Sequence, residues 1–505
     1  MKFEYLQRIL KARVYDVAIE SPLEPARRLS RRLGNRVLFK REDLQPVFSF
    51  KLRGAYNKIS SLPDEVAARG VICASAGNHA QGVALAAQHR GIPALVVMPR
   101  TTPAIKIEAV RDRGAEIELA GDDYDAAFER AGELAAGRGL TFIHPFDDPE
   151  VIAGQGTVAM EILRQHEGRL DGIFVPVGGG GLIAGIACYV KALHPEIRVI
   201  GVEPEDAAGM HASLAAGRRV TLERVGLFAD GVAVRRVGEE TFRLAREYVD
   251  EVVLVDNDEI CAAIQDIFED TRSIAEPAGA LAVAGLKKWT AREAFRGGSF
   301  VTLCSGANMN FDRLRHVAER ADLGQHREAL FAVEIPEEPG SFLRFCETFA
   351  ARNVTEFNYR YARADRAQIF VGLALTQGRA EKDLVLRGLR EAQYAVTDMT
   401  DDEMAKLHVR YMVGGHAGGL ADEVLYRFEF PEKPGALHRF LRSIGTRWNI
   451  SLFHYRNHGS DSGRVLAGIQ VPPDSAAEFL RHLMDLSYAY VEETANPAYR
   501  IFLGG

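Results

Sequence analysis

The stretch Gly172-Ile-Phe-Val-Pro-Val-Gly-Gly-Gly-Gly-Leu-Ile-Ala-Gly-Ile-Ala-Cys-Tyr-Val190 joins two apolar runs through four consecutive glycines. Residues 172–177 predict a buried strand, and residues 182–190 predict an apolar helix. Further apolar strands are expected at 71–74, 94–98, 199–202 and 300–304, with Ala-, Arg- and Glu-rich helices between them. Strands that alternate with helices are typical of an α/β fold with parallel sheets.

The four glycines predict an anion site. A flexible linker would lie in polar sequence, whereas glycines between a strand and a helix let backbone N–H groups surround a phosphate at the positive end of the helix. A dinucleotide-binding loop is the competing interpretation. Gly179, Gly181 and Ala184 satisfy G-x-G-x-x-A, and Glu203 ends the next strand, where a ribose-binding acid is expected. Spacing alone does not decide between the two interpretations.

Lys51 lies between apolar neighbours in Ser49-Phe-Lys-Leu-Arg-Gly54. An amine that loses hydration has a lowered pKa, and its neutral form can attack an aldehyde. Lys51 is therefore a candidate Schiff-base residue, although lysines are usually solvated surface residues.

Two polar segments follow predicted strands. SAGNHAQG at 75–82 comes after the strand at 71–74, and we expect a carboxylate-binding turn there that opens a helix at Val83–His89. Ser305-Gly-Ala-Asn308 follows the strand at 300–304. Each segment taken alone is also compatible with an ordinary helix cap.

Together these motifs resemble the fold type II (β-family) pyridoxal-phosphate enzymes and, among them, the threonine dehydratases. SFKLRGAYNK at 49–58, SAGNHAQG, the GGGGL loop, ADGVAV at 229–234, EPAGA at 276–280 and CSGAN at 304–308 stand in the family's order. The resemblance covers about residues 5–320 and implies pyridoxal 5'-phosphate as cofactor. It implies a large domain, with a small domain at about 55–150 inserted in it, that closes over the substrate.

The resemblance also implies roles for individual residues. Lys51 would hold the cofactor and carry the Cα proton, and Ser75 would assist as a catalytic and carboxylate-binding residue. Cofactor contacts would come from Phe50, Asn78, Ser305 and the loop Gly178, Gly179, Gly180, Gly181 and Leu182. Substrate contacts would come from Ser75, Ala76, Gly77, Asn78 and His79.

The activity implied is deamination of L-threonine to 2-oxobutanoate and ammonia, and of L-serine to pyruvate. Racemases of this family carry a second serine where this chain has Ala76, so we expect negligible racemisation. Some relatives bind a cation through a glutamate, a carbonyl and an aspartate. Glu203 and Ala207 match the first two positions, but Gly209 takes the third, so no metal is expected.

The composition is typical of a large enzyme that acts on small molecules. The 505 residues predict two or more domains, and the net charge of −7 without a basic tract argues against nucleic acid or a membrane surface as partner. No apolar run is long enough to cross a bilayer, and the start of the chain does not read as a signal peptide, so the cytoplasm is expected. The five cysteines are widely separated, which argues against disulfides.

An internal repeat occupies the C-terminal part. EIPEEPGSFLRF at 334–345 recurs as EFPEKPGALHRF at 429–440, and NVTEFNYR at 353–360 recurs as NISLFHYR at 449–456. Each copy predicts strand, Pro-Gly turn, helix, two strands, helix and strand. This pattern resembles the ACT-like regulatory domains of biosynthetic threonine dehydratases, which are α+β ferredoxin-like folds.

We therefore expect a catalytic region at 1–324 and regulatory domains at 325–411 and 412–505. The resemblance implies a homotetramer inhibited by isoleucine, with valine opposing the inhibition. The turns at Pro339-Gly340 and Pro434-Gly435 are the candidate effector positions. Two other functional classes stay open at this point: an NAD-dependent dehydrogenase that uses the glycine loop, and a non-catalytic amino-acid sensor.

Overall fold

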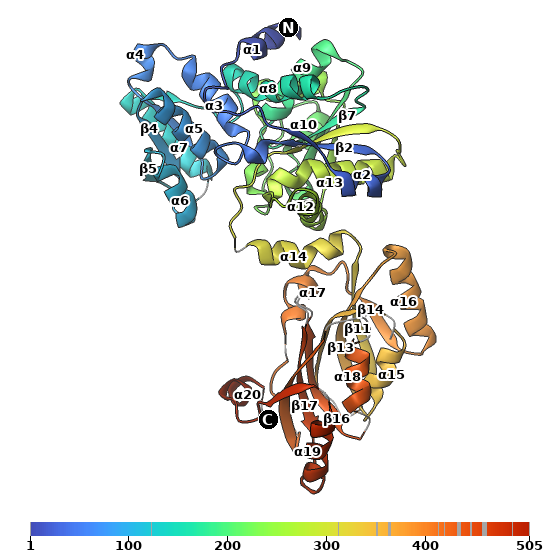
Figure 1. The fold of residues 1–505 in the computed structure, drawn as a ribbon. Coiled ribbons are helices and arrows are strands. Elements are labelled where there is room, and N and C mark those ends of the chain that lie inside the picture. Colours follow the sequence, from blue (N-terminus) through green and yellow to red (C-terminus); the bar gives the residue numbers. More distant parts are fainter. Residues whose placement is uncertain are drawn as a thin grey trace. The chain divides into compact units, whose positions relative to one another are not determined.

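The computed structural model describes residues 2–122, 124–311, 313–349, 352–361, 365–412, 414–418, 420–431, 436–444, 447–456, 462–486 and 488–503. The chain divides into two compact units, Met1–Gly324 and Gln325–Gly505 (Figure 1).

A six-stranded sheet forms the centre of the first unit. Its order is β1-β2-β10-β7-β8-β9, and all neighbours are parallel except the edge strand β1. The strands are β1 (Leu23–Pro25), β2 (Arg36–Arg41), β7 (Gly172–Pro176), β8 (Arg198–Pro204), β9 (Glu251–Val255) and β10 (Ser299–Cys304). Strands β7 and β10 are fully buried, because helices cover both faces of the sheet.

Helices lie on both sides of this sheet (Figure 1). α9 (Gly181–Leu193) packs on β7 and β8 with α8 (Pro149–Gln165) outside it, and α13 (Pro277–Arg292) packs on the other face with α12 (Asn257–Thr271) beyond. The remaining helices of eight or more residues in the described part of the first unit are α1 (Lys2–Lys11), α3 (Lys51–Ser60), α5 (Asn78–Arg90), α6 (Ala104–Arg111), α7 (Tyr124–Arg138), α10 (Gly209–Ala216), α11 (Glu239–Tyr248) and α14 (Arg313–Gly324).

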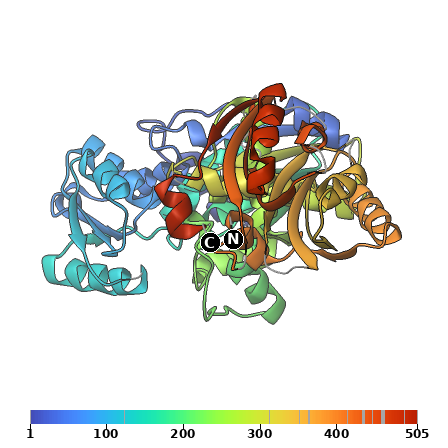
Figure 2. The same cartoon turned by 90° about the horizontal axis from the view of Figure 1, so that it is seen from below.

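A smaller, all-parallel sheet of four strands belongs to the same unit and stands to the left of the six-stranded sheet in Figure 2. Its order is β5-β4-β3-β6, with β3 (Val71–Ala74), β4 (Ala94–Met98), β5 (Glu116–Leu119) and β6 (Thr141–Phe142). It has apolar clusters of its own on either face. The predicted class, α/β with two parallel-type sheets, is confirmed.

Helix α5 starts earlier than the sequence predicted. We expected a turn up to Gly82 and a helix from Val83, but the helix begins at Asn78. Gly82 lies inside it because α3 packs closely there: a Cβ on Gly82 would be 3.0 Å from the backbone N of Leu52. A glycine that looks like a turn residue in sequence is here a helix contact.

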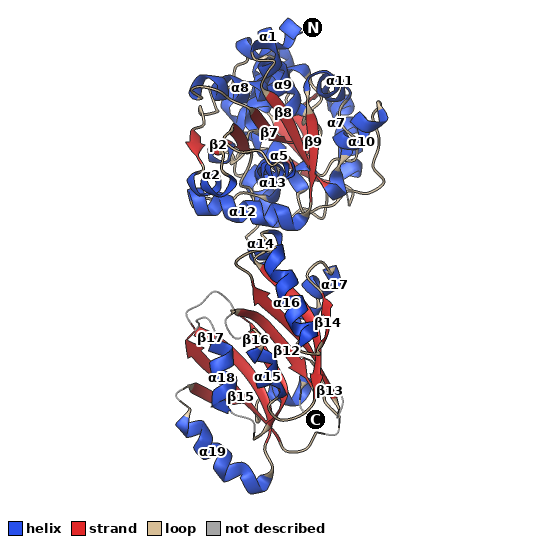
Figure 3. Cartoon of the chain, turned by 90° about the vertical axis from the view of Figure 1, so that its right-hand side faces the viewer, coloured by secondary structure: helices blue, strands red, loops and turns tan. Residues whose placement is uncertain are grey.

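The second unit contains one eight-stranded sheet, with order β14-β11-β13-β12-β16-β17-β15-β18 (Figure 3). The first repeat gives β11 (Glu328–Pro336), β12 (Val354–Arg360), β13 (Arg366–Ala374) and β14 (Ala395–Asp398). The second gives β15 (Glu423–Pro431), β16 (Asn449–Arg456), β17 (Ser462–Gln470) and β18 (Ala489–Glu492). Helices α15 (Ser341–Glu347), α16 (Arg379–Glu391), α18 (Ala436–Ile444) and α19 (Ala476–Asp485) lie over one face (Figure 3).

The two ferredoxin-like repeats are confirmed, but their fusion into one sheet was not predicted. Antiparallel pairing of β12 with β16 joins them, from Glu356 opposite Arg456 to Arg360 opposite Leu452. Apolar side chains of both copies then form a single core.

Candidate active site

The carboxyl end of β10 is hydrogen-bonded to the segment that precedes α3. The backbone N–H of Phe50 donates to the carbonyl of Ser305 at 3.4 Å, and Ala307 N donates to Phe48 O at 2.9 Å. Ser49 and Gly306 also form an isolated antiparallel bridge. Lys51, which begins α3, is therefore fixed beside the carboxyl end of β10, where Ser305 is buried and its hydroxyl donates to Ala278 O at 3.3 Å.

Lys51 has the environment of a reactive amine. Its Nζ lies 3.4 Å from Pro145 O and 5.5 Å from the centroid of the Phe50 ring. Burial lowers the pKa of Lys51 to about 8, while the carboxylate of Glu276 opposes part of this fall. A substantial fraction of the amine is thus neutral near physiological pH.

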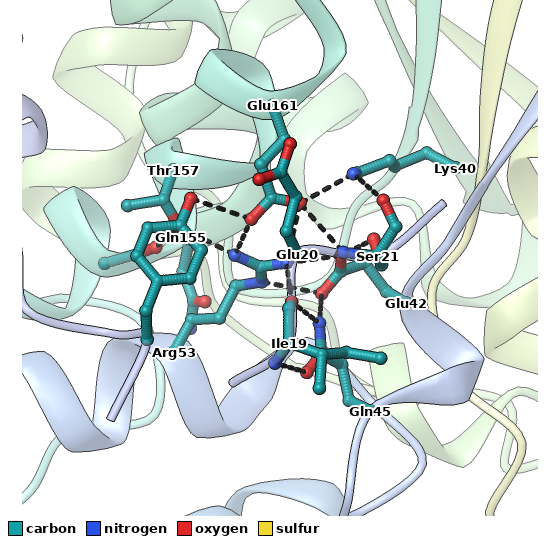
Figure 4. A network of polar contacts seen from close by, with 12 residues as sticks. Ile19, Glu20, Ser21, Lys40, Glu42, Gln45, Arg53, Gln155, Thr157 and Glu161 are labelled. Atoms are coloured by element: carbon teal, nitrogen blue, oxygen red, sulfur yellow. Dashed lines mark hydrogen bonds and ion pairs between the residues drawn. The ribbon is translucent and has the colours of Figure 1, made fainter. Parts of the chain in front are cut away.

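A buried network of charges holds α3 through Arg53, two residues after Lys51 in the sequence (Figure 4). Arg53 is completely buried and forms two-pronged ion pairs with Glu42 at 2.8 Å and with Glu161 at 2.5 and 3.0 Å. Lys40 Nζ donates to Glu161 at 2.6 Å, to Ser21 O at 2.6 Å and to Gln165 at 3.0 Å. Two cations and two carboxylates therefore balance in the interior and tie α3 to β2 and α8.

The glycine loop is closely packed against neighbouring segments. A Cβ on Gly179 would overlap the ring of Phe146, and one on Gly178 would be 2.9 Å from Val232 Cα. Gly180 has φ of +97°, which strains other residues. The carbonyl of Gly179 accepts from Thr241 Oγ1 at 2.6 Å and from Gly238 N at 3.2 Å, while Leu182 is buried in the first turn of α9. The first N–H groups of a helix have no acceptor within it, so they can receive an anion.

The segment before α5 supplies a second backbone site. Ser75 to Asn78 are half-buried, and Ser75 Oγ accepts from Gly77 N at 3.2 Å. His79 is buried and its Nε2 donates to Ile143 O at 2.8 Å. Burial lowers the pKa of His79 to about 3, so the ring stays neutral.

The structure assigns contacts to one acid that the sequence reasoning left without a role. Glu276 is buried, and its Oε1 accepts from Asn78 Nδ2 at 2.6 Å. Asn308 Nδ2 donates to the other side of the same amide, Asn78 Oδ1, at 2.6 Å. An acid inside the otherwise apolar run 274–280, directly before a proline, was the signal in the sequence, but it reads equally well as a helix cap.

Glu203 is occupied by a structural contact. Its two carboxylate oxygens accept from Met210 N and His211 N, both at 2.8 Å, so it caps α10. It is fully buried, which leaves no oxygen for the ribose of a dinucleotide. Among the residues that the structure describes, no cluster of three or more His, Cys, Asp or Glu side chains is arranged to hold a metal ion.

The residues fit pyridoxal phosphate. The glycine loop leaves no room for a side chain and ends at a helix N-terminus, as a phosphate cradle requires. Phe50 is hydrogen-bonded to Ser305, and Asn78 is hydrogen-bonded to Asn308. Lys51, Asn78 and Ser305 would hold the aldehyde carbon, the ring oxygen and the ring nitrogen respectively. Phe50 would contact the ring.

The fold and this site define a class, the fold type II pyridoxal-phosphate enzymes with an appended regulatory region. The family model of pyridoxal-phosphate dependent enzymes matches residues 14–306, and that of the C-terminal regulatory domain of threonine dehydratase matches 319–409 and 414–503.

Similar proteins make the assignment narrower. The chain is 59% identical to the biosynthetic L-threonine dehydratase of Burkholderia multivorans over 99% of both sequences. It is 55% identical to that of Escherichia coli, over 99% of this chain and 97% of the relative. The solved structure of processed threonine deaminase isoform 2 from Solanum lycopersicum is 53% identical, with a TM-score of 0.63 over 64% of this chain and 88% of that one. The chain belongs to the biosynthetic threonine dehydratase family.

Proposed function

We propose that this protein deaminates L-threonine to 2-oxobutanoate and ammonia with pyridoxal phosphate, as the first step of isoleucine biosynthesis. The observation that supports the proposal is Lys51, a partly buried amine with a pKa of about 8 whose neighbour Phe50 is hydrogen-bonded to Ser305. L-Serine is a second substrate, because losing one methyl group from a pocket changes binding by only about 1–3 kcal/mol.

The residues divide the work. When bound, pyridoxal phosphate supplies an aldehyde that holds the substrate amine and a ring that withdraws electrons from Cα. The amides around Ser75, Ala76, Gly77, Asn78 and His79 bind the substrate carboxylate. Lys51 Nζ accepts the Cα proton, and the β-hydroxyl takes a proton from a nearby acid and leaves as water. The product then takes up one water and releases ammonia. Ser305, a neutral hydroxyl, does not favour a charged ring, which suits elimination.

The absence of racemisation is expected from the face of the substrate opposite Lys51. Ala76 offers no hydroxyl there to return a proton to Cα. The product is therefore keto acid and not D-amino acid. Incubation with L-serine, followed by chiral chromatography, checks this expectation.

The second unit is proposed as the regulatory region. Isoleucine inhibits the deamination, and valine opposes this inhibition. Each effector acts by binding two states of the enzyme with different affinity. At the predicted turn, Gly340 has φ of +86° and precedes α15, and the neighbouring Glu337 accepts from Asn449 of the other repeat at 3.0 Å. The turn at Pro434-Gly435 lies outside the described residues.

The working assembly is proposed to be a homotetramer in the cytoplasm. In the described part of the chain, none of the helices has the length and apolar character needed to cross a membrane.

Incubation with L-threonine and a keto-acid assay, with and without isoleucine, tests the proposal. Purified protein should be yellow, and borohydride should fix the cofactor on Lys51. Lys51→Ala should lose the colour and turnover. Binding of NAD without a Lys51 adduct would favour the dehydrogenase alternative, and removal of 325–505 should abolish inhibition by isoleucine but not turnover.

A further inference from the structure

Glu276 occupies the N-cap position of α13 but does not cap it. An acid at this position usually accepts hydrogen bonds from the first N–H groups of its helix, and Glu276 makes no such side-chain bond. Its carboxylate is turned instead toward Asn78, which lies 198 residues earlier in the chain. Glu276 thus makes a tertiary hydrogen bond in place of a local helix cap, which indicates that its carboxylate acts on Asn78.

Two glycines lie against the Glu276 carboxylate. A Cβ on Gly306 would overlap Glu276 Oε1, and one on Gly231 would be 3.6 Å from the same atom. The backbone of Glu276 is held as well, because its N–H donates to Gly306 O at 3.0 Å. The acceptor atom is therefore fixed against Asn78 by groups of the six-stranded sheet.

The contact determines which way the amide of Asn78 points. The NH₂ group of Asn78 donates to Glu276, and the ionised carboxylate favours this orientation because it only accepts hydrogen bonds. Asn308 Nδ2 donates to Asn78 Oδ1 at 2.6 Å and to Val47 O at 2.8 Å, which fixes the oxygen in the opposite direction. One Nδ2 hydrogen of Asn78 is used by Glu276, and the second is left for a ligand.

The same contact sets the two sheets relative to each other. Asn78 begins α5 of the four-stranded part, whereas Glu276 and Asn308 belong to the six-stranded part. A second polar bridge lies close by, between Lys106 Nζ of α6 and Asp230 at 2.6 Å. Helix α3 packs directly on α5 at Gly82 and is tied to the six-stranded part through Arg53, so Glu276 is one of the contacts that set how the segment 75–79 meets Lys51.

We propose that Glu276 is a positioning residue of the active site, which orients the Asn78 amide toward the cofactor and places a negative charge near Lys51. This inference rests on the proposed function. The charged groups that face Glu276 are Asp230, Lys106 and Lys51. Burial and the nearby Asp230 raise the pKa of Glu276 to about 7, while Asn78, Lys106 and the N–H of Asn308 favour its ionised form.

The test compares holoenzymes of the wild type, Glu276→Gln, Asn78→Ala and the double variant. Measurements are the dissociation constant for pyridoxal phosphate, the pH midpoint of the cofactor absorption band without substrate, and kcat and KM. Glu259→Gln is the control, because it neutralises a partly buried helix-capping glutamate of the same unit that bonds to Lys288 and the backbone of Asp256.

We expect Glu276→Gln to hold the cofactor about tenfold more weakly and to lower the pH midpoint by roughly one unit, because a carboxylate favours a charged nitrogen nearby. kcat should fall more than KM rises. In the Asn78→Ala background, Glu276→Gln should weaken the cofactor less than about twofold further, since the two residues act as a unit. The Glu259→Gln control should match the wild type.

Wild-type cofactor affinity and midpoint in Glu276→Gln, or additive losses in the double variant, would overturn the inference. If Glu276→Gln does not fold, Asn308→Ala replaces it: cofactor retention should drop while the midpoint stays, and unchanged retention would refute the orienting role. Mass spectrometry of reduced wild-type protein separates the two levels. Without an adduct on Lys51, the proposed function falls together with this inference; with an adduct and an unaltered Glu276→Gln, only this inference falls.

Discussion

The buried charge network of Lys40, Glu42, Arg53 and Glu161 allows a quantitative test, in which one cation and one carboxylate are neutralised separately and together. Lys40→Met leaves Arg53 with two carboxylates, a net charge of −1, and Glu161→Gln leaves two cations with Glu42 alone, a net charge of +1. Both substitutions together restore neutrality. The four side chains are completely buried, so no water is at hand to compensate for a missing partner.

The size of each effect follows from this burial. Removing one partner of a buried pair costs about 3–5 kcal/mol, since the remaining charge is uncompensated. The double variant should lose less than the sum of the two single losses, with a coupling of about 1–3 kcal/mol. Arg164→Met is the control, because Arg164 lies on the same helix α8 and pairs at 2.7 Å with Glu20 at the surface.

Thermal unfolding followed by circular dichroism, at one scan rate for all variants, measures these losses. The single variants should unfold several degrees lower than the wild type, and Arg164→Met close to it. Strictly additive single and double losses would refute the argument that the network is stabilised by its neutrality.

Three further predictions concern the same unit. In apoenzyme, the rate at which Lys51 captures pyridoxal phosphate should rise through a midpoint near pH 8, read from the absorption band; a midpoint near the ordinary lysine value would show that burial does not control the amine. Gly179→Ala should lose most cofactor affinity in a dialysis assay, because its Cβ overlaps Phe146, and Gly179→Ala with Phe146→Leu should recover part of it; no recovery would place the conflict elsewhere. Burial raises the pKa of Glu161, but Arg53 and Lys40 outweigh burial and hold this pKa below its usual range. The stabilisation that Glu161 provides is therefore complete above the ordinary carboxyl pKa and is lost as the pH falls through the lowered pKa of the folded state. The difference in Tm between the wild type and Glu161→Gln should shrink in acid, and a constant difference would contradict this.

Local patterns in the sequence predicted the framework well. The strand, glycine run and helix at 172–190 and the repeated tail depend on neighbours in the chain, and the structure confirms these elements. Glu203 shows the limit, because its position suggested a ribose or metal ligand while its oxygens cap α10. An acid at a strand end looks the same in sequence whichever partner it meets.

Pairs distant in the chain were beyond this reasoning. Arg53 and Glu161 are 108 residues apart, and Asn78 and Glu276 are 198 apart, so no periodicity connects them. The start of α5 was missed for a related reason. A glycine is needed at position 82 because α3 packs closely there, and not because the chain turns at that point. Tertiary contacts override local preference at such positions.

The junction between β12 and β16 gives the C-terminal half a mechanical property. Each repeat contributes the edge strand of its own four strands to this pairing, and the ion pair between Arg360 and Glu423 crosses the same junction. Separating the two repeats would break this hydrogen-bonded ladder and open their common core, so we expect the C-terminal unit to unfold as one cooperative unit.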